Sequence, residues 1–187
     1  MAYDKNIHGV VNTARHEGTI NGTAHTQVMV YDSGANAGNK VDCDNGTIVT
    51  LGNYMALDTT IEPNYEVYKA NIETSKTGED IKNVVIVASP EMIYDETYHY
   101  GLENFYNEAD KPVRAYFLKN NSMISLSKEA FSNPTDVAVG QDVYLAGEKK
   151  LTVGSSISDA YKVGHIESAY VYDYITMYNV RFMTDVD

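Results

Sequence analysis

The chain has 187 residues, of which 43% are hydrophobic and 21% are charged, and its formal net charge is −12. This length can build one well-buried domain, or one domain with an arm, and the composition argues against wholesale disorder. The negative charge disfavours nucleic acid as a partner, because phosphate binding requires clustered Lys and Arg, and it also disfavours an anionic membrane. It suits a partner whose surface is basic.

Cysteine usage and the N-terminus bear on the compartment. Cys43 is the only cysteine, so no intramolecular disulfide is expected, and a reducing compartment is favoured. Residues 1–8 lack an apolar core segment, so we expect no signal peptide. No segment approaches the ~20 apolar residues that a membrane helix requires. The 16 tyrosines, with no tryptophan, suit sheet faces and interfaces that stay partly wet.

Residues 1–27 are predicted to form an extended N-terminal arm. They are rich in Asn, Gly, Thr and His, and their few large apolar side chains are too sparse to build a core of their own. The arm would therefore be ordered only by the surface on which it lies. The apolar residues that would make this contact, together with one tyrosine, are Tyr3, Ile7, Val10, Val11 and Ile20.

Residues 28–51 are predicted to form a β-hairpin. Short strands are expected at residues 27–31 and 47–51. The sequence Asp44-Asn45-Gly46 between them is a strong turn signal, because Asn and Gly tolerate a positive φ.

Residues 52–187 are predicted to form one compact all-β domain, a barrel or a sandwich. Apolar stretches of strand length recur at roughly eight- to twelve-residue spacing with turn residues between them. Helix is expected only as short pieces between residues 90 and 108. A second hairpin is expected around Asn120-Asn121. The strands of this domain are expected at residues 65–72, 83–88, 114–119, 123–126, 141–146, 151–153 and 166–183.

The last of these strands carries an unusual aromatic pattern. Tyr170, Tyr172, Tyr174 and Tyr178 all fall on even positions, and a period of two places them on one face of a single strand. Three exposed tyrosines in a row would create a patch of the kind that marks an interface. We expect Tyr170, Tyr172 and Tyr174 to pack either in the sheet core or in a subunit contact, and we favour the core.

Metal sites can be sought in two places. Asp42, Asp44 and Asn45 resemble the start of a calcium loop, but Gly46 comes one position too early and no Glu closes the loop, so a hairpin turn is preferred. His8, His16 and His25 are eight and nine residues apart, wider than the local spacing of zinc ligands. We interpret them as isolated surface histidines.

Catalytic constellations are equally sparse. His99 lies between two tyrosines and is expected to be packed or solvated. Cys43 has no basic neighbour nearer than Lys40, which leaves an activated thiolate unsupported. No G-x-S-x-G, Walker or H-E-x-x-H motif occurs, so we expect a non-enzymatic protein without metal or cofactor. An acidic run could supply paired carboxylates but is ordinary in so acidic a chain: Glu91, Asp95, Glu96 and Glu103.

Residues 64–182 resemble the head decoration proteins, or capsid cements, of tailed bacteriophages that infect Gram-positive bacteria. The resemblance is carried by a buried strand followed by Pro-Glu and Tyr-Asp-Glu, a Pro-Val-Arg strand, a strand ending in Glu-Ala-Phe, and a Val-Gly turn. These segments are residues 83–96, 111–118, 123–131 and 139–143.

The resemblance implies a structural virion protein, made in the host cytoplasm, that binds the outer surface of the capsid. Its partners would be the major capsid protein and neighbouring copies of itself, and both a monomer and a trimer are compatible with this role. The N-terminal arm would contact the capsid. The alternative from a different class is a carbohydrate-binding β-module whose exposed tyrosines stack on sugar rings.

Overall fold

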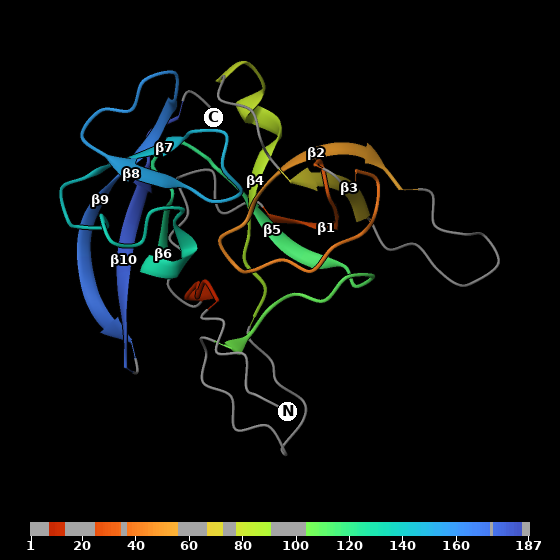
Figure 1. The fold of residues 1–187 in the computed structure, drawn as a ribbon, viewed down its shortest axis with the longest axis horizontal. Helices are drawn as coiled ribbons and strands as arrows, with labels where there is room; N and C mark the ends of the chain where they lie inside the picture. Colours follow the sequence, from red (N-terminus) through yellow and green to blue (C-terminus); the bar gives the residue numbers. More distant parts are fainter. Residues whose placement is uncertain are drawn as a thin grey trace.

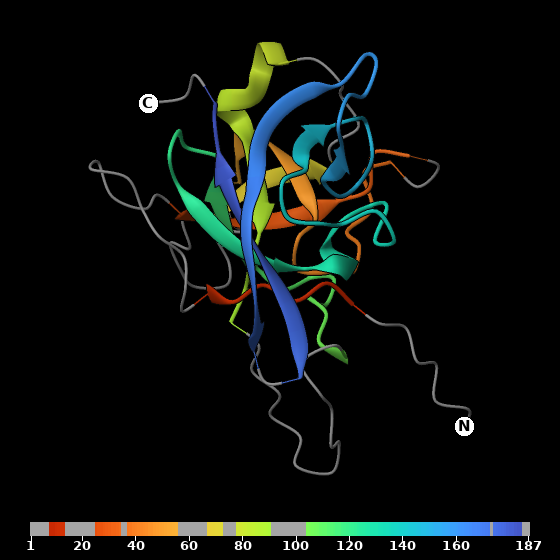
Figure 2. The same cartoon turned by 90° about the vertical axis from the view of Figure 1, so that its left-hand side faces the viewer.

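Two β-sheets make up the part of the chain that the computed structural model describes, which comprises residues 8–13, 25–34, 37–55, 67–72, 78–90, 104–172 and 174–184. The sheets lie side by side, with the first on the right of Figure 1 and the second on the left. A quarter turn brings the second sheet to the front (Figure 2). The all-β fold predicted from the sequence is confirmed.

The first sheet is a closed barrel with the strand order β1-β3-β2-β4-β5. β1 runs parallel to β3 and closes the barrel by pairing antiparallel with β5, where Val28 faces Val113. The remaining pairs are antiparallel. The strands are β1 (His25–Tyr31), β2 (Ile48–Tyr54), β3 (Val67–Ile72), β4 (Val84–Val87) and β5 (Val113–Phe117).

The second sheet is open and antiparallel, with the order β6-β10-β9-β7-β8. Its longest pairing is the β9–β10 hairpin. In Figure 1 this hairpin extends beyond the other strands at the lower left. The strands are β6 (Met123–Ser127), β7 (Asp142–Leu145), β8 (Thr152–Gly154), β9 (Tyr161–Tyr172) and β10 (Ile175–Phe182).

The sequence of β4 is an uninterrupted apolar run, and its position between the two cores explains why. All four of its residues are buried, because one face points into the barrel and the other toward the second sheet. Val85 and Val87 belong to the barrel interior, whereas Val84 and Ile86 belong to the core between the two sheets. Burial on both faces removes the usual alternation of apolar and polar residues.

The core between the sheets is the larger of the two and joins them into one body. From the barrel it includes Ile48, Ile86 and Leu118, which follows β5. From the second sheet it includes Leu126 and Phe182, which are almost completely buried. Neither sheet can therefore expose this face without losing apolar burial.

Helix is confined to short 3-10 turns within the described residues. The two with printed bounds, η2 (Gly78–Asn83) and η4 (Lys128–Ala130), lie outside the predicted window of residues 90–108, so the window was wrong for them. Single 3-10 positions also occur at Thr13 and at Asn104, and Asn104 lies inside that window. Residues 91–103, where most of that window lies, are outside the described residues. η4 follows β6 directly, where the backbone turns away from the sheet.

The predicted hairpin over residues 28–51 was also wrong. β1 pairs with β3 and β5, whereas β2 pairs with β3 and β4, so the two strands do not meet. The turn itself exists, with Gly46 at φ +90°. The turn leads into β2, which lies two strands away from β1 in the barrel order.

The predicted hairpin around Asn120-Asn121 fails for a related reason. Asn121 adopts a positive φ of 62°, as the turn signal requires. However, β5 belongs to the barrel and β6 to the second sheet. The turn therefore carries the chain from one sheet to the other, and local sequence signals do not distinguish such a crossing from a hairpin.

Candidate interaction surface

The C-terminal strand predicted for residues 166–183 is in fact two strands, β9 and β10. Tyr172 pairs directly with Ile175, which leaves two residues between the strands. Cross-strand partners share a face, so even positions in β9 lie beside odd positions in β10. Tyr170 therefore shares a face with Met177, while Tyr178 lies on the opposite face beside Ala169. The turn therefore places Tyr170 and Tyr178 on opposite faces of the sheet, whereas the sequence pattern predicted a single tyrosine face.

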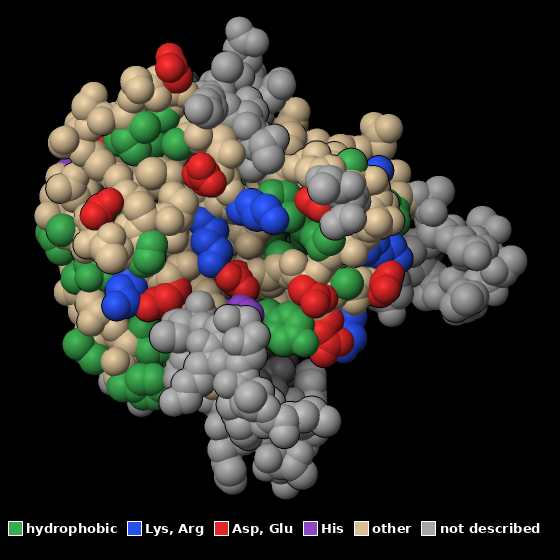
Figure 3. Space-filling model, in the orientation of Figure 1, with side chains coloured by type: hydrophobic (Ala, Val, Ile, Leu, Met, Phe, Trp, Pro, Cys, Tyr) green, Lys and Arg blue, Asp and Glu red, His purple; other side chains and the backbone are tan. Residues whose placement is uncertain are grey.

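The end of the hairpin is apolar and exposed. Tyr172 is 39% exposed, Tyr174 is 58% exposed and Val171 is 69% exposed. The prediction that Tyr172 and Tyr174 pack in the sheet core was therefore wrong, whereas Tyr170 is half-buried. Figure 3 shows hydrophobic side chains at the lower left of the molecule, where the hairpin ends in Figure 1. We call Val171, Tyr172 and Tyr174 the hairpin tip.

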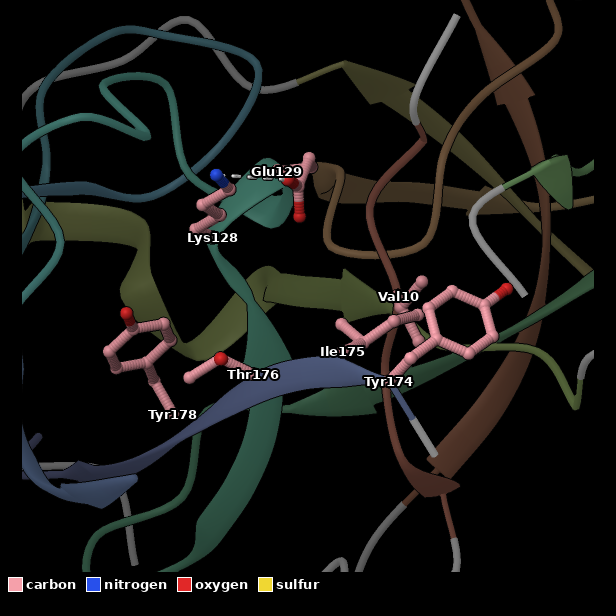
Figure 4. Close-up of a pocket in the computed structure, with 7 residues that line it drawn as sticks. All are labelled: Val10, Lys128, Glu129, Tyr174, Ile175, Thr176 and Tyr178. Atoms are coloured by element: carbon pink, nitrogen blue, oxygen red, sulfur yellow. Dashed lines mark ion pairs between the residues drawn. The ribbon is translucent and has the colours of Figure 1, made fainter. Parts of the chain in front are cut away.

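A groove of about 400 Å³ lies beside the hairpin tip (Figure 4). The β10–β6 ladder begins at the pair Met177–Ser127, so the hairpin overhangs the end of β6. Lys128 and Glu129 of η4, together with Val10 near the N-terminus, complete the groove. Lys128 and Glu129 form an ion pair of 3.9 Å on the groove wall. The lining residues are Val10, Lys128, Glu129, Tyr174, Ile175, Thr176 and Tyr178.

Residues 8–12, here called the N-terminal segment, pack on the second sheet. Val11 forms an antiparallel bridge with Leu126, and Val10 and Val11 are almost fully buried. These two predicted contact residues are thus engaged within their own chain, although Val10 also lines the groove. The other predicted contact residues, Tyr3, Ile7 and Ile20, lie outside the described residues, and their contact role stays a prediction.

A cluster of three polar side chains, His8, Asp44 and Lys150, holds the N-terminal segment at its start and is here called the tie at Asp44. The Asp44 carboxylate lies 2.5 Å from His8 Nδ1 and accepts a 2.6 Å bond from Lys150 Nζ. Lys150 also donates to the Glu129 carbonyl oxygen at 2.9 Å. Burial opposes ionisation of Asp44, but hydrogen bonds from Lys150 and His8 outweigh it and lower the pKa of this carboxyl group. Asp44 is a structural junction in this arrangement.

A second charged cluster lies on the exposed face of β7 and β9. Asp142 accepts from Lys162 at 2.8 Å and lies 3.0 Å from His165 Nδ1. The hydrogen bond from Lys162, followed by that from His165, lowers the pKa of Asp142. Further along, Arg181 holds Glu167 through two nitrogen atoms, which lowers the pKa of Glu167. These pairs are the ordinary cross-strand pairs of a solvated sheet face.

The remaining candidates for chemistry occupy structural positions or fall outside the described residues. Cys43 is buried, and burial together with Asp44 and Asp42 raises the pKa of its thiol to about 12. It therefore stays protonated at neutral pH. His25 packs its ring against Tyr116 at 5.7 Å. The residues outside the described part are His16, His99, Glu91, Asp95, Glu96 and Glu103.

Within the described ranges, no three His, Cys, Asp or Glu side chains gather closely enough to hold a metal ion. In the same part of the chain, no helix is long and apolar enough to cross a membrane. Neither the tie at Asp44 nor the groove has a local sequence signal, because their members come from segments that lie more than a hundred residues apart, as His8 and Lys150 or Val10 and Tyr178 do. The hairpin tip could have been found only by recognising a turn at Asp173-Tyr174, which lacks Gly and Asn.

Comparison with known proteins gives no assignment. No family model, curated protein or solved structure matches this chain.

Proposed function

We propose that this chain is a capsid decoration protein, which binds the outer surface of a tailed-phage head and joins neighbouring major capsid subunits without catalysing a reaction. The proposed class of protein rests on the resemblance of residues 64–182 to capsid decoration proteins. The structural observation that supports it is the hairpin tip, where Tyr172 and Tyr174 and, on the opposite face of β9, Val171 are exposed at the end of a two-stranded projection. Large apolar side chains exposed near one another are typical of interaction sites.

The hairpin tip has the chemistry of a binding anchor. Tyrosine contributes a large contact area with few rotatable bonds, and it is enriched among the residues that dominate interface energies. The net charge of −12 would speed association with a basic patch on the partner. A protein that binds only the assembled shell stabilises that shell by mass action.

The proposal is tested with the double variant Tyr172→Ser/Tyr174→Ser and phage heads that lack this protein. Both side chains are exposed, so we expect the melting temperature to stay within a few degrees of the wild type. Two anchors worth about 2 kcal/mol each would weaken cosedimentation with the heads by on the order of 10²–10³-fold. The matched control is Val139→Ser, because Val139 is 54% exposed but lies in a different loop.

The control should bind as the wild type does. Binding of the double variant at wild-type affinity would exclude the hairpin tip as the anchor. Failure of the wild-type protein itself to bind the heads would exclude the decoration function.

A second candidate is a carbohydrate-binding module, favoured by the exposed Tyr174 beside a groove whose wall carries Lys128 and Glu129. An aromatic ring next to polar groups can stack on a sugar ring and bond its hydroxyls. A glycan array separates the two functions: reproducible binding that is lost in Tyr174→Ser supports the module, and the absence of any glycan ligand leaves the capsid as the partner.

A further inference from the structure

The N-terminal segment continues the second sheet beyond β6, its edge strand. Ser127 N donates to the Val10 carbonyl oxygen at 2.8 Å, and Asn12 N donates to the Ser125 carbonyl oxygen at 3.1 Å. These bonds flank the antiparallel bridge between Val11 and Leu126. The segment therefore acts as an added strand that covers an otherwise open sheet edge.

The added strand contacts the rest of the molecule through its side chains as well as through its backbone. Asn12 Nδ2 donates to the Tyr170 hydroxyl oxygen at 3.0 Å. At the other end, His8 bonds Asp44. A Cβ on Gly9 would lie 2.3 Å from the Asn45 carbonyl oxygen, so only glycine fits there. The β6 edge is thus shaped for this sequence, and an unrelated strand would lose most of these contacts.

None of these contacts involves β1, the next described element along the chain. The segment packs on the second sheet, whereas β1 begins at His25 in the barrel. Twelve residues separate Asn12 from His25. A fully extended connection of that length reaches roughly 40 Å. The same contacts can consequently be made with the β6 edge of an adjacent molecule.

We propose that the β6 edge is an acceptor site for the N-terminal segment of a second copy of this chain, so that neighbouring copies exchange these strands. The proposal does not depend on the capsid function. Because the exchanged and closed forms contain the same contacts, their balance is set by concentration, as in domain swapping. A segment tethered to its own acceptor site competes at an effective concentration on the order of 1 mM, so exchange becomes appreciable when copies are packed at that density.

The test is a disulfide between Val11→Cys and Leu126→Cys in a Cys43→Ala background. The flanking bonds identify Val11–Leu126 as a non-hydrogen-bonded pair, whose Cα atoms lie about 4.5 Å apart, within the range of a disulfide. The protein is refolded at about 1 µM and at about 1 mM and then oxidised, and the products are separated on a non-reducing gel. We expect intramolecular disulfides at the low concentration and disulfide-linked dimers and larger species at the high one.

The control is Val143→Cys/Val153→Cys in the same background, because these residues pair within the β7–β8 hairpin and should stay intramolecular throughout. Val11 and Leu126 are core residues, so a second variant, Asn12→Cys/Tyr170→Cys, is cross-linked with a short bifunctional maleimide. Intermolecular products above the control level at the high concentration, from either variant, support exchange. Exclusively intramolecular products from both variants at both concentrations would overturn it.

Discussion

At the scale of single residues, Asp44 joins three parts of the chain that are distant in sequence. Its carboxylate binds His8 and Lys150, and Lys150 in turn reaches the Glu129 carbonyl oxygen. We expect Asp44→Asn to lower the free energy of unfolding by about 2 kcal/mol, the usual cost of losing hydrogen bonds to a charged group. For a chain of this size the melting temperature would fall by about 4–8 °C.

The matched control is Asp110→Asn. Asp110 pairs with Lys40 at 2.7 Å, but its side chain is 74% exposed. Exposed ion pairs contribute about 0–1 kcal/mol, so this variant should melt close to the wild type. Equal melting temperatures for both variants would show that the tie at Asp44 contributes no more than a surface pair.

The lowered pKa of Asp44 fixes the sign of its pH dependence. The carboxyl group binds protons less readily in the folded chain than in the unfolded one, where its ordinary value is 3.8. Its stabilisation is therefore complete above that value and is lost as the pH falls through the lower folded-state pKa. In urea titrations, the stability difference between wild type and Asp44→Asn should be constant from about pH 5 to pH 7 and shrink below about pH 4. A difference that grew on acidification would contradict the assignment.

At the scale of elements, the N-terminal segment depends on Gly9. Its hydrogen atom faces the Asn45 carbonyl oxygen, and a methyl group there would also approach Ala130. Gly9→Ala should therefore displace the segment and expose the Ser127 amide, which donates to Val10, to faster hydrogen exchange. Gly34→Ala is the control, because its added Cβ would meet only the Asp32 carboxylate oxygen at 3.5 Å, an ordinary contact. Unchanged protection of Ser127 in Gly9→Ala would show that the segment tolerates the clash.

The elements also show how far sequence patterns reach. Strand positions were largely predictable, because alternation, apolar runs and turn residues are local properties. Strand partners were not, since the parallel β1–β3 pair and the crossing at Asn121 depend on contacts between distant segments. The hairpin tip was missed because a two-residue turn preserves the spacing of the tyrosines while exchanging their faces. Local periodicity carries no information about such an inversion.

At the scale of the whole molecule, the core between the sheets should make them unfold together. Phe182 lies in this core and is 1% exposed, so Phe182→Ala should cost about 3–5 kcal/mol. The neighbouring Met183 is 50% exposed, and Met183→Ala should change stability by less than about 0.5 kcal/mol. The informative measurement is native-state hydrogen exchange of an amide in each sheet. These are Val87 N, which donates to the Thr47 carbonyl oxygen in the barrel, and Met183 N, which donates to the Val163 carbonyl oxygen in the second sheet.

If the shared core couples the sheets, Phe182→Ala will accelerate exchange at both amides by a similar factor, on the order of 10²–10³, since each 1.4 kcal/mol is tenfold. The coupling has a physical origin, because opening the second sheet alone would expose Ile86 and Leu118 from the barrel side of the same core. Acceleration confined to Met183 N, with Val87 N unchanged, would show instead that the barrel is stable alone. The second sheet would then be a separate unit that can open without it.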